Sequence, residues 1–187
     1  MLPVYIALGV VVLLVIYIIA IYNGLVSKRQ TANEAFAGID VQLKLRRELI
    51  PNLVETVKGY AAHERGTLDA VVKARNAAVS AGTPEAQAQA ENMLSGALRQ
   101  LFALAEAYPN LKANDNFRDL QAQLSDIENK IAAARRFFNN AVSEYNASIQ
   151  QFPAVILAGP LGFRERGFFE LDEGERAAVN VAPQVKF

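Results

Sequence analysis

The chain has 187 residues, with 19 Lys and Arg against 19 Asp and Glu, no cysteine and one histidine. This charge balance gives no global argument for binding nucleic acid. The lack of cysteine excludes disulfides, thiolate metal sites and cysteine nucleophiles. About 160 residues follow an apolar N-terminal run, which is enough for one domain with a hydrophobic core.

The N-terminal run is apolar at nearly every residue from Leu2 to Tyr22, and the first charges are Lys28 and Arg29. As a helix it spans about 30 Å, the thickness of the hydrocarbon core of a bilayer. Tyr5 and Tyr22 lie near its two ends, where aromatic side chains favour the membrane interface. We therefore predict a transmembrane anchor over residues 1–27. Its representative residues are Leu2, Tyr5, Leu13, Ile18 and Tyr22.

A cleaved signal peptide is the alternative for this segment. A signal peptide has a basic start, a shorter apolar core and a cleavage site with small residues. Here no basic side chain precedes the run, the run is longer, and Ala20 is followed by Ile21, Tyr22 and Asn23. We favour an uncleaved single-pass anchor. Because the Lys and Arg residues follow the run, the large domain is expected on the cytoplasmic side.

Residues 28–151 are predicted to form a long helical bundle. The first long helix extends over about 27–80, with apolar residues at alternating steps of three and four. Pro51 lies inside it and removes the backbone hydrogen bond to the Arg47 carbonyl, so a kink or split is expected there. Two roles are open for the neighbouring Asn52: its amide satisfies that carbonyl, or it faces solvent.

Two further helices follow. Thr83 is the expected N-cap of the second, Pro84 its first helical residue, and Tyr108 its end. The third begins at Asn114 or Asp115 and carries an apolar stripe to about residue 152. Short connections make consecutive helices antiparallel neighbours. The predicted class is all-α, with an elongated antiparallel bundle of three long helices after the anchor.

Several polar residues lie on or beside the apolar stripes. The interpretation we favour is that they form hydrogen bonds and ion pairs between helices and so fix the register of the bundle. The functional alternative is a polar binding groove. These residues are Arg46, Arg75, Glu106, Glu128, Asn129, Arg135 and Asn146.

Motifs for catalysis or metal binding are weak. His63 and Glu64 begin like a zinc-protease helix motif, but the position that needs the second histidine is Thr67. The glycines of residues 159–162 lack the lysine and following helix of a phosphate-binding loop. We therefore predict no enzyme activity and no catalytic, cofactor or metal site.

Residues 152–163 form an uncharged, mostly apolar segment that is too short to span a bilayer. Three roles are open: a cap on the bundle, a self-association surface, or a membrane contact. An unbroken first helix would place the segment far from the anchoring bilayer, whereas a split at Pro51 would return it there. The last 24 residues are expected to be extended, and 152–187 are grouped as one region. The candidate interface residues are Phe152, Val155, Ile156, Leu157, Leu161 and Phe163.

The chain resembles the LemA family of bacterial membrane proteins over nearly its whole length. The most specific matching blocks are Arg46-Arg47-Glu48-Leu49-Ile50-Pro51-Asn52-Leu53-Val54, and Glu106-Ala107-Tyr108-Pro109 with Leu111-Lys112-Ala113 and Asn116-Phe117. Further matches are Ile39-Asp40-Val41-Gln42-Leu43, Val57-Lys58-Gly59-Tyr60-Ala61, Tyr145-Asn146, Phe152-Pro153 and Gly162-Phe163. One departure is Phe138, where the family pattern has a tyrosine before the asparagine.

The resemblance implies one N-terminal transmembrane helix, a long helical bundle and no settled enzymatic activity. It also implies kinship with magnetosome membrane proteins and a link to envelope stress. From this we predict a scaffold at the bacterial inner membrane that self-associates and organises or shapes the bilayer. Its expected partners are the lipid bilayer and further copies of itself, with no nucleic acid and no cofactor. The alternative is an adaptor that presents a membrane protease, a sensor kinase or another signalling partner.

Overall fold

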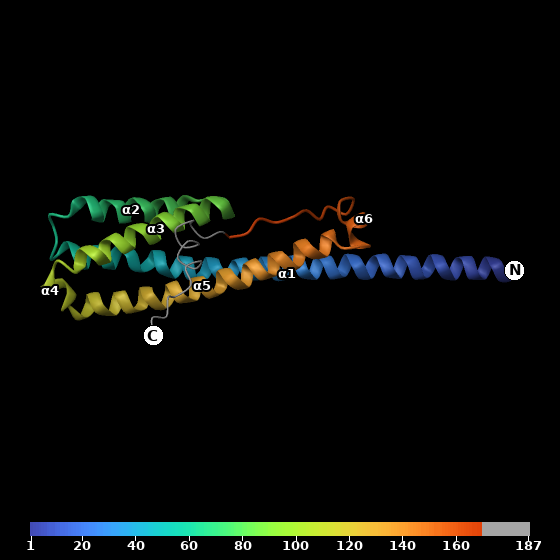
Figure 1. Ribbon diagram of the computed structural model, residues 1–187, viewed down its shortest axis with the longest axis horizontal. Helices are drawn as coiled ribbons and strands as arrows, with labels where there is room; N and C mark the ends of the chain where they lie inside the picture. The colour runs from blue at the N-terminus through green and yellow to red at the C-terminus, as the bar shows by residue number, and fades with distance from the viewer. Residues whose placement is uncertain (170–187) are drawn as a thin grey trace, which may run out of the picture. The chain divides into compact units, whose positions relative to one another are not determined.

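The computed structural model describes residues 1–169, and within them the chain is helical with no strand. The predicted all-α class is confirmed. Residues 170–187, most of the tail expected to be extended, lie outside the described residues. The helices are α1 (Leu2–Lys58), α2 (Arg65–Ser80), α3 (Pro84–Ala105), α4 (Pro109–Lys112), α5 (Asp115–Gln150) and α6 (Ala154–Ala158) (Figure 1).

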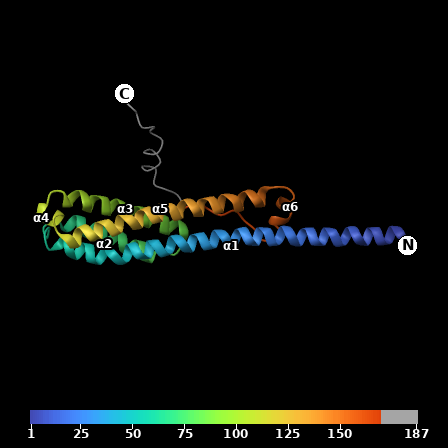
Figure 2. The same ribbon diagram turned by 90° about the horizontal axis from the view of Figure 1, so that it is seen from below.

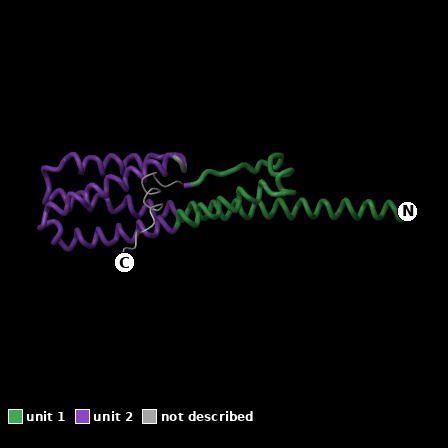
Figure 3. Tube along the Cα trace, viewed as in Figure 1, with its two compact units in different colours: residues 1–38, 134–168 green, residues 39–133, 169–187 purple. Residues whose placement is uncertain are grey.

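The described chain divides into two compact units, coloured separately in Figure 3. Unit 1 contains Met1–Gly38 and Ala134–Phe168, and the described part of unit 2 is Ile39–Ala133 with Phe169. Helices α1 and α5 each contribute one part to unit 1 and the other to unit 2. The apolar N-terminal run and the apolar segment 152–163 therefore belong to unit 1.

The first helix ends earlier than its apolar pattern predicts. α1 continues through Pro51 and stops at Lys58, and α2 begins at Arg65, so the break lies at 59–64 and not at Pro51. Glycine is among the poorest helix formers, and Gly59 follows the last helical residue. The backbone N–H groups of Tyr60 and Ala61 both donate to the Val57 carbonyl, at 3.0 and 2.8 Å. The predicted long helix over 27–80 is thus two helices.

Two helix starts are fixed by side-chain caps. The Thr83 hydroxyl accepts a hydrogen bond from the Ala86 N–H at 3.2 Å, and Pro84 is the first residue of α3, which confirms both predictions. Of the two candidates at the start of α5, Asn114 is the cap. Its side-chain oxygen accepts from the Phe117 N–H at 2.9 Å.

Unit 2 is a bundle in which parts of α1 and α5 pack with α2 and α3, and the short α4 connects α3 to α5 (Figures 1 and 2). Near Arg47, α1 meets the C-terminal end of α2, and the residues just beyond α1 meet the start of α5 through Tyr60 and Asn114. α2 and α5 therefore run antiparallel to α1. The buried apolar core is Ile50, Leu53, Val57, Ala61, Leu68, Val71, Ala74, Leu94, Ala97, Leu98, Leu101, Ala105, Leu111, Phe117 and Leu124.

The connections at one end of unit 2 are held by tyrosine hydrogen bonds. The Tyr108 hydroxyl donates to the Glu64 carboxylate at 3.0 Å, and the Asn114 amide donates to the Tyr60 hydroxyl at 3.1 Å. The hydrogen bond to Glu64 is the main cause that raises the pKa of Tyr108 above its usual value. This hydrogen bond therefore stabilises the fold below the ordinary tyrosine pKa, and its contribution is lost as the pH rises through the raised one.

Unit 1 consists of the first part of α1, the last part of α5, α6 and the segment that follows it. The rings of Phe36 and Phe138 are in contact at a tilt of 58°, with their centres 5.6 Å apart, and Lys28 lies 3.7 Å from Glu144. Residue numbers thus fall along α1 as they rise along α5, which makes this pair antiparallel. The side chains of residues 1–20 are all exposed, and packing along α1 begins at Ile21.

A core substitution tests the packing of unit 2. Leu53→Ala removes a fully buried side chain of α1, and we expect it to lower the free energy of unfolding by about 2–5 kcal/mol. Val79→Ala, on α2, is the control because Val79 is 57% exposed; its effect should stay within about 0.5 kcal/mol. Urea unfolding of the full-length protein followed by circular dichroism measures both. Equal losses from the two variants would contradict the packing of α1 described above.

Candidate functional site

A buried arginine is the centre of the polar network in unit 2. Arg46 of α1 is fully buried. One guanidinium nitrogen donates to the Ser95 hydroxyl at 2.7 Å and to the Glu128 carboxylate. The other donates to the Glu91 carbonyl at 3.1 Å and to the Glu91 carboxylate. A single side chain of α1 therefore binds groups on both α3 and α5.

A second arginine completes the neutralisation of Glu91. Glu91 is also fully buried, and its second carboxylate oxygen lies 3.4 Å from the Arg47 guanidinium. Arg47 donates to the Ala78 carbonyl at 2.7 Å and lies 3.7 Å from Asp40. The Gln87 amide donates to Asp40 at 3.0 Å. The Ala78 carbonyl is in the last turn of α2, so Arg47 places a cation at the negative end of that helix dipole.

The chemistry of this network is that of a structural ion cluster. Arg46 and Arg47 are both cations, and each donates to groups of the same chain. The buried carboxylate of Glu91 faces these two cations. Within residues 1–169, no group of three or more His, Cys, Asp or Glu side chains is placed to hold a metal ion.

Pro51 creates an acceptor that α2 uses. Because proline has no N–H, the Arg47 carbonyl loses its donor within α1. The Arg75 side chain of α2 donates to that carbonyl at 3.4 Å. Asn52 is exposed, so the role considered for its amide is taken by Arg75. The proline thus provides a docking point for α2 in a helix that continues past it.

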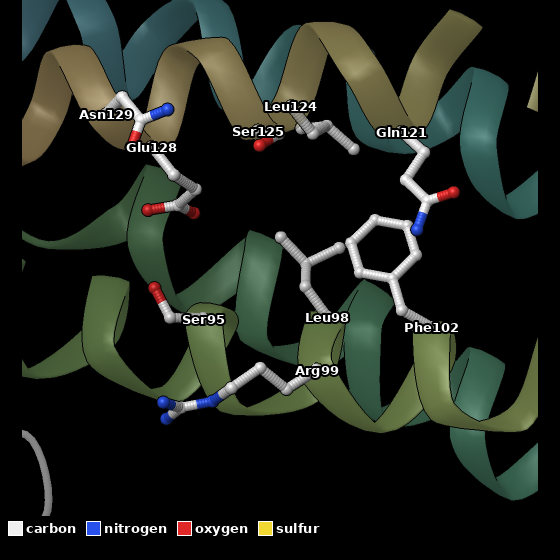
Figure 4. A pocket seen from close by; sticks show the side chains of 9 residues that line it. All are labelled: Ser95, Leu98, Arg99, Phe102, Gln121, Leu124, Ser125, Glu128 and Asn129. Atoms are coloured by element: carbon white, nitrogen blue, oxygen red, sulfur yellow. The ribbon is translucent and has the colours of Figure 1, made fainter. Parts of the chain in front are cut away.

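A cleft of about 380 Å³ opens between α3 and α5 beside this cluster (Figure 4). Glu128 and Ser95 point toward one another at one end, and Phe102 and Gln121 lie at the other. The cleft thus has an apolar floor and a polar rim. Its lining residues are Ser95, Leu98, Arg99, Phe102, Gln121, Leu124, Ser125, Glu128 and Asn129.

The apolar turn, which we define as residues 152–163, packs on α1 within unit 1. Ala154, Ala158 and Phe163 are buried in a cluster with Leu25, Tyr145 and Ile149. The rings of Phe163 and Tyr22 meet edge to face with centres 5.6 Å apart. The remaining predicted interface residues are less covered: Phe152, Val155, Ile156 and Leu161 are exposed, and Leu157 is half-buried.

The other polar residues singled out by sequence are dispersed. Glu106 forms an exposed ion pair with Lys112, and Asn129 lines the cleft. Arg135 is buried in unit 1. Asn146 pairs with the backbone of Arg166, donating to its carbonyl at 2.9 Å and accepting from its N–H at 3.0 Å. These residues do not converge on one site.

Of the two carboxylates that bind Arg46, Glu128 is among the polar residues predicted from the sequence and Glu91 is not. Glu91 was not singled out, although it lies next to Ala90 on the apolar stripe of α3. Ser95, Asp40 and Gln87 were also missed, because nothing in their spacing distinguishes them from exposed polar residues. The arginine itself was the available signal, because a cation within a predicted apolar stripe requires a carboxylate on a facing helix.

Comparison with known proteins identifies the family. A family model described as the LemA family matches residues 35–187. The chain belongs to the LemA family. The matched region contains the whole Arg46 cluster and the apolar turn, and the family resemblance drawn from the sequence is confirmed.

Relatives of this LemA-family chain share about a quarter of its residues. Magnetosome protein MamQ of Magnetospirillum gryphiswaldense is 26% identical over 174 residues, covering 79% of this chain, and the chain spans 64% of that relative's length. Magnetosome protein MamQ 2 of Paramagnetospirillum magneticum is 26% identical, with 90% of this chain and 73% of the relative covered. Protein LemA of Metamycoplasma hominis is 26% identical, with 86% and 74% covered.

Removing the central cation should destabilise the bundle strongly. Arg46→Met leaves the buried Glu91 with Arg47 as its remaining cation, and we expect a loss of about 3–5 kcal/mol in the free energy of unfolding. Adding Glu91→Met should recover much of that loss, because no buried charge is then left without its partner. The control is Lys44→Met, which breaks an exposed pair with Glu48 and should change stability by less than about 1 kcal/mol. A double variant less stable than Arg46→Met alone would contradict the direct pairing.

Proposed function

We propose that this protein is a non-enzymatic, membrane-anchored helical scaffold that self-associates at the bacterial inner membrane and organises or shapes the bilayer. The observation that carries the proposal is the N-terminal part of α1. This helix is long and apolar enough to cross a membrane, and none of the residues in its apolar window is buried within the chain. An apolar helical surface of this length without a protein partner is what a bilayer accommodates.

The use of the polar residues supports a structural role over catalysis. The strongest charge cluster of the described residues, centred on Arg46, binds groups of its own chain on α3 and α5. Its function in this proposal is to hold the bundle in one register. The family kinship with proteins named for the magnetosome supports a task at a membrane.

Self-association requires an exposed surface on the bundle. Val41 and Leu45 of α1 are both exposed and lie one helical turn apart, on the same side of the helix. Large apolar side chains in this arrangement favour a contact with another helix. A second copy of the chain is the occupant that the scaffold proposal assigns to this surface. The Lys and Arg residues after the anchor favour a cytoplasmic position for it.

An adaptor is the second candidate function, and the cleft between α3 and α5 is the observation that favours it. Its apolar floor, formed by Leu98, Phe102 and Leu124, and its polar rim suit a segment of a protein partner. In that case the protein would remain small until the partner, such as a membrane protease or a sensor kinase, is added.

The mass and shape of the full-length protein in mild detergent test the scaffold. Light scattering and negative-stain imaging should show large, uniform particles. Val41→Lys combined with Leu45→Lys should reduce them to small species, because both charges would be buried at the contact. Val79→Lys on α2 is the matched control, since Val79 is exposed to a similar degree. A monomer or dimer of the unmodified protein would overturn the scaffold and turn the search to a partner.

A further inference from the structure

The apolar turn packs against α1 at the end of the helix segment that is long enough to span a membrane. Twenty residues from Leu2 to Ile21 span about 30 Å of helix, the thickness of the hydrocarbon core. The buried cluster of the turn contacts α1 at Ile21, Leu25 and Val26, immediately after that span. Both ribbon views show α6 beside α1 just where α1 continues alone toward the N-terminus (Figures 1 and 2). A bilayer that holds the anchor therefore reaches the turn.

The turn has one covered face and one open apolar face. In α6, Ala154 and Ala158 are buried against the rest of unit 1. On the other side, Phe152 is 80% exposed, Val155 50% and Ile156 63%. Small residues toward the protein and large apolar residues away from it form the pattern of a segment that lies in an interface.

The turn is held in place by the residues that follow it. Gly162 has a φ of 79°, a left-handed conformation that glycine adopts readily, and the chain then returns so that Phe163 packs on Tyr22. The Tyr145 hydroxyl donates to the Arg164 carbonyl at 3.0 Å. These contacts fix the level of the turn along α1.

The charges around the turn suit anionic headgroups. Residues 152–163 carry no charge, and basic residues flank them on both chain segments: Lys28 and Arg29 on α1, with Arg164 and Arg166 after the turn. The Arg29 guanidinium lies over the Phe163 ring at 5.0 Å. Glu144 pairs with Lys28, so these two charges offset each other. Arg29, Arg164 and Arg166 then stand against Glu165, which accepts from the Gln150 amide at 2.6 Å.

We propose that the apolar turn inserts into the headgroup and acyl boundary of the same bilayer that α1 crosses, so that each chain holds its membrane at two points. The expected depth is about 5–10 Å, with Phe152, Val155 and Ile156 in contact with lipid. This inference rests on the proposed membrane function. A second copy of the chain covering the turn is the alternative outcome of the test.

Fluorescence quenching tests the proposal with single cysteines, which the cysteine-free chain allows. Full-length Ile156→Cys, Leu13→Cys and Met93→Cys carry one fluorophore each in vesicles of phosphatidylethanolamine and phosphatidylglycerol. The vesicles contain nitroxide lipids that quench either at shallow or at deep positions. We expect Leu13 to be quenched by deep lipids and Ile156 by shallow lipids, severalfold more strongly than Met93. Met93 is the control because it is exposed on α3.

The outcomes separate this inference from the proposed function. If the label at Leu13 is quenched but the label at Ile156 is quenched no more than the label at Met93, the inserted turn is overturned and the anchor stands. Energy transfer between labels at Ile156 on different copies, without lipid quenching, would assign the turn to self-association and also overturn it. Lack of quenching at Leu13 would overturn the anchor and the turn together.

A charge variant gives a second readout. Phe152→Glu combined with Ile156→Glu places two carboxylates on the exposed face, where they leave the protein interior unchanged. A label at Val155→Cys should then lose its shallow quenching, because burying charge in the interface is unfavourable. The label at Leu13 should keep its deep quenching, and circular dichroism should show an unchanged helix content. Quenching at residue 155 that persists in this variant would contradict the inserted turn.

Discussion

A single buried cation connects three of the helices of unit 2. An arginine away from water is tolerated only when carboxylates and carbonyls meet its donors, and Arg46 of α1 finds these groups on α3 and α5. The guanidinium therefore bonds α1 to two other helices at one level along their length. The same three helices contribute to the apolar core of unit 2, and two of them line the cleft beside Glu128.

The sequence indicated much of the architecture because periodic apolar stripes reflect burial directly. Local patterns were enough to recognise the N-terminal apolar run, the Thr83 cap of α3 and the long helix α5. The break in the first long helix was misplaced for an equally local reason. Proline commonly interrupts helices, so the break was expected at Pro51. Pro51 removes only the hydrogen bond to the Arg47 carbonyl, and that carbonyl accepts from Arg75 of α2 instead. Gly59, which follows the end of α1, gives a weaker signal in the sequence.

The candidate sites were less predictable because they depend on which residues meet across helices. Arg46 was recognisable as a polar residue within an apolar stripe. Its partner Glu91 was not recognisable, because the stripe pattern does not say which acidic residue faces Arg46. Whether residues 152–163 return to the N-terminal part of α1 depends on the number of helices before them, because each helix reverses the direction of the chain. With the break at 59–64, an additional helix reverses the chain once more, and residues 152–163 return to α1 beside Ile21 and Leu25.

The acceptor that Pro51 frees has a consequence for substitutions on α1. It is a backbone carbonyl, so its position depends on the proline and not on the side chain at position 47. Substitutions on the surface of α1 around it leave the acceptor in place for the long side chain of Arg75. This contact between α1 and α2 is therefore set by the position of the backbone, whereas the contact of Arg47 with the Ala78 carbonyl depends on a side chain of α1.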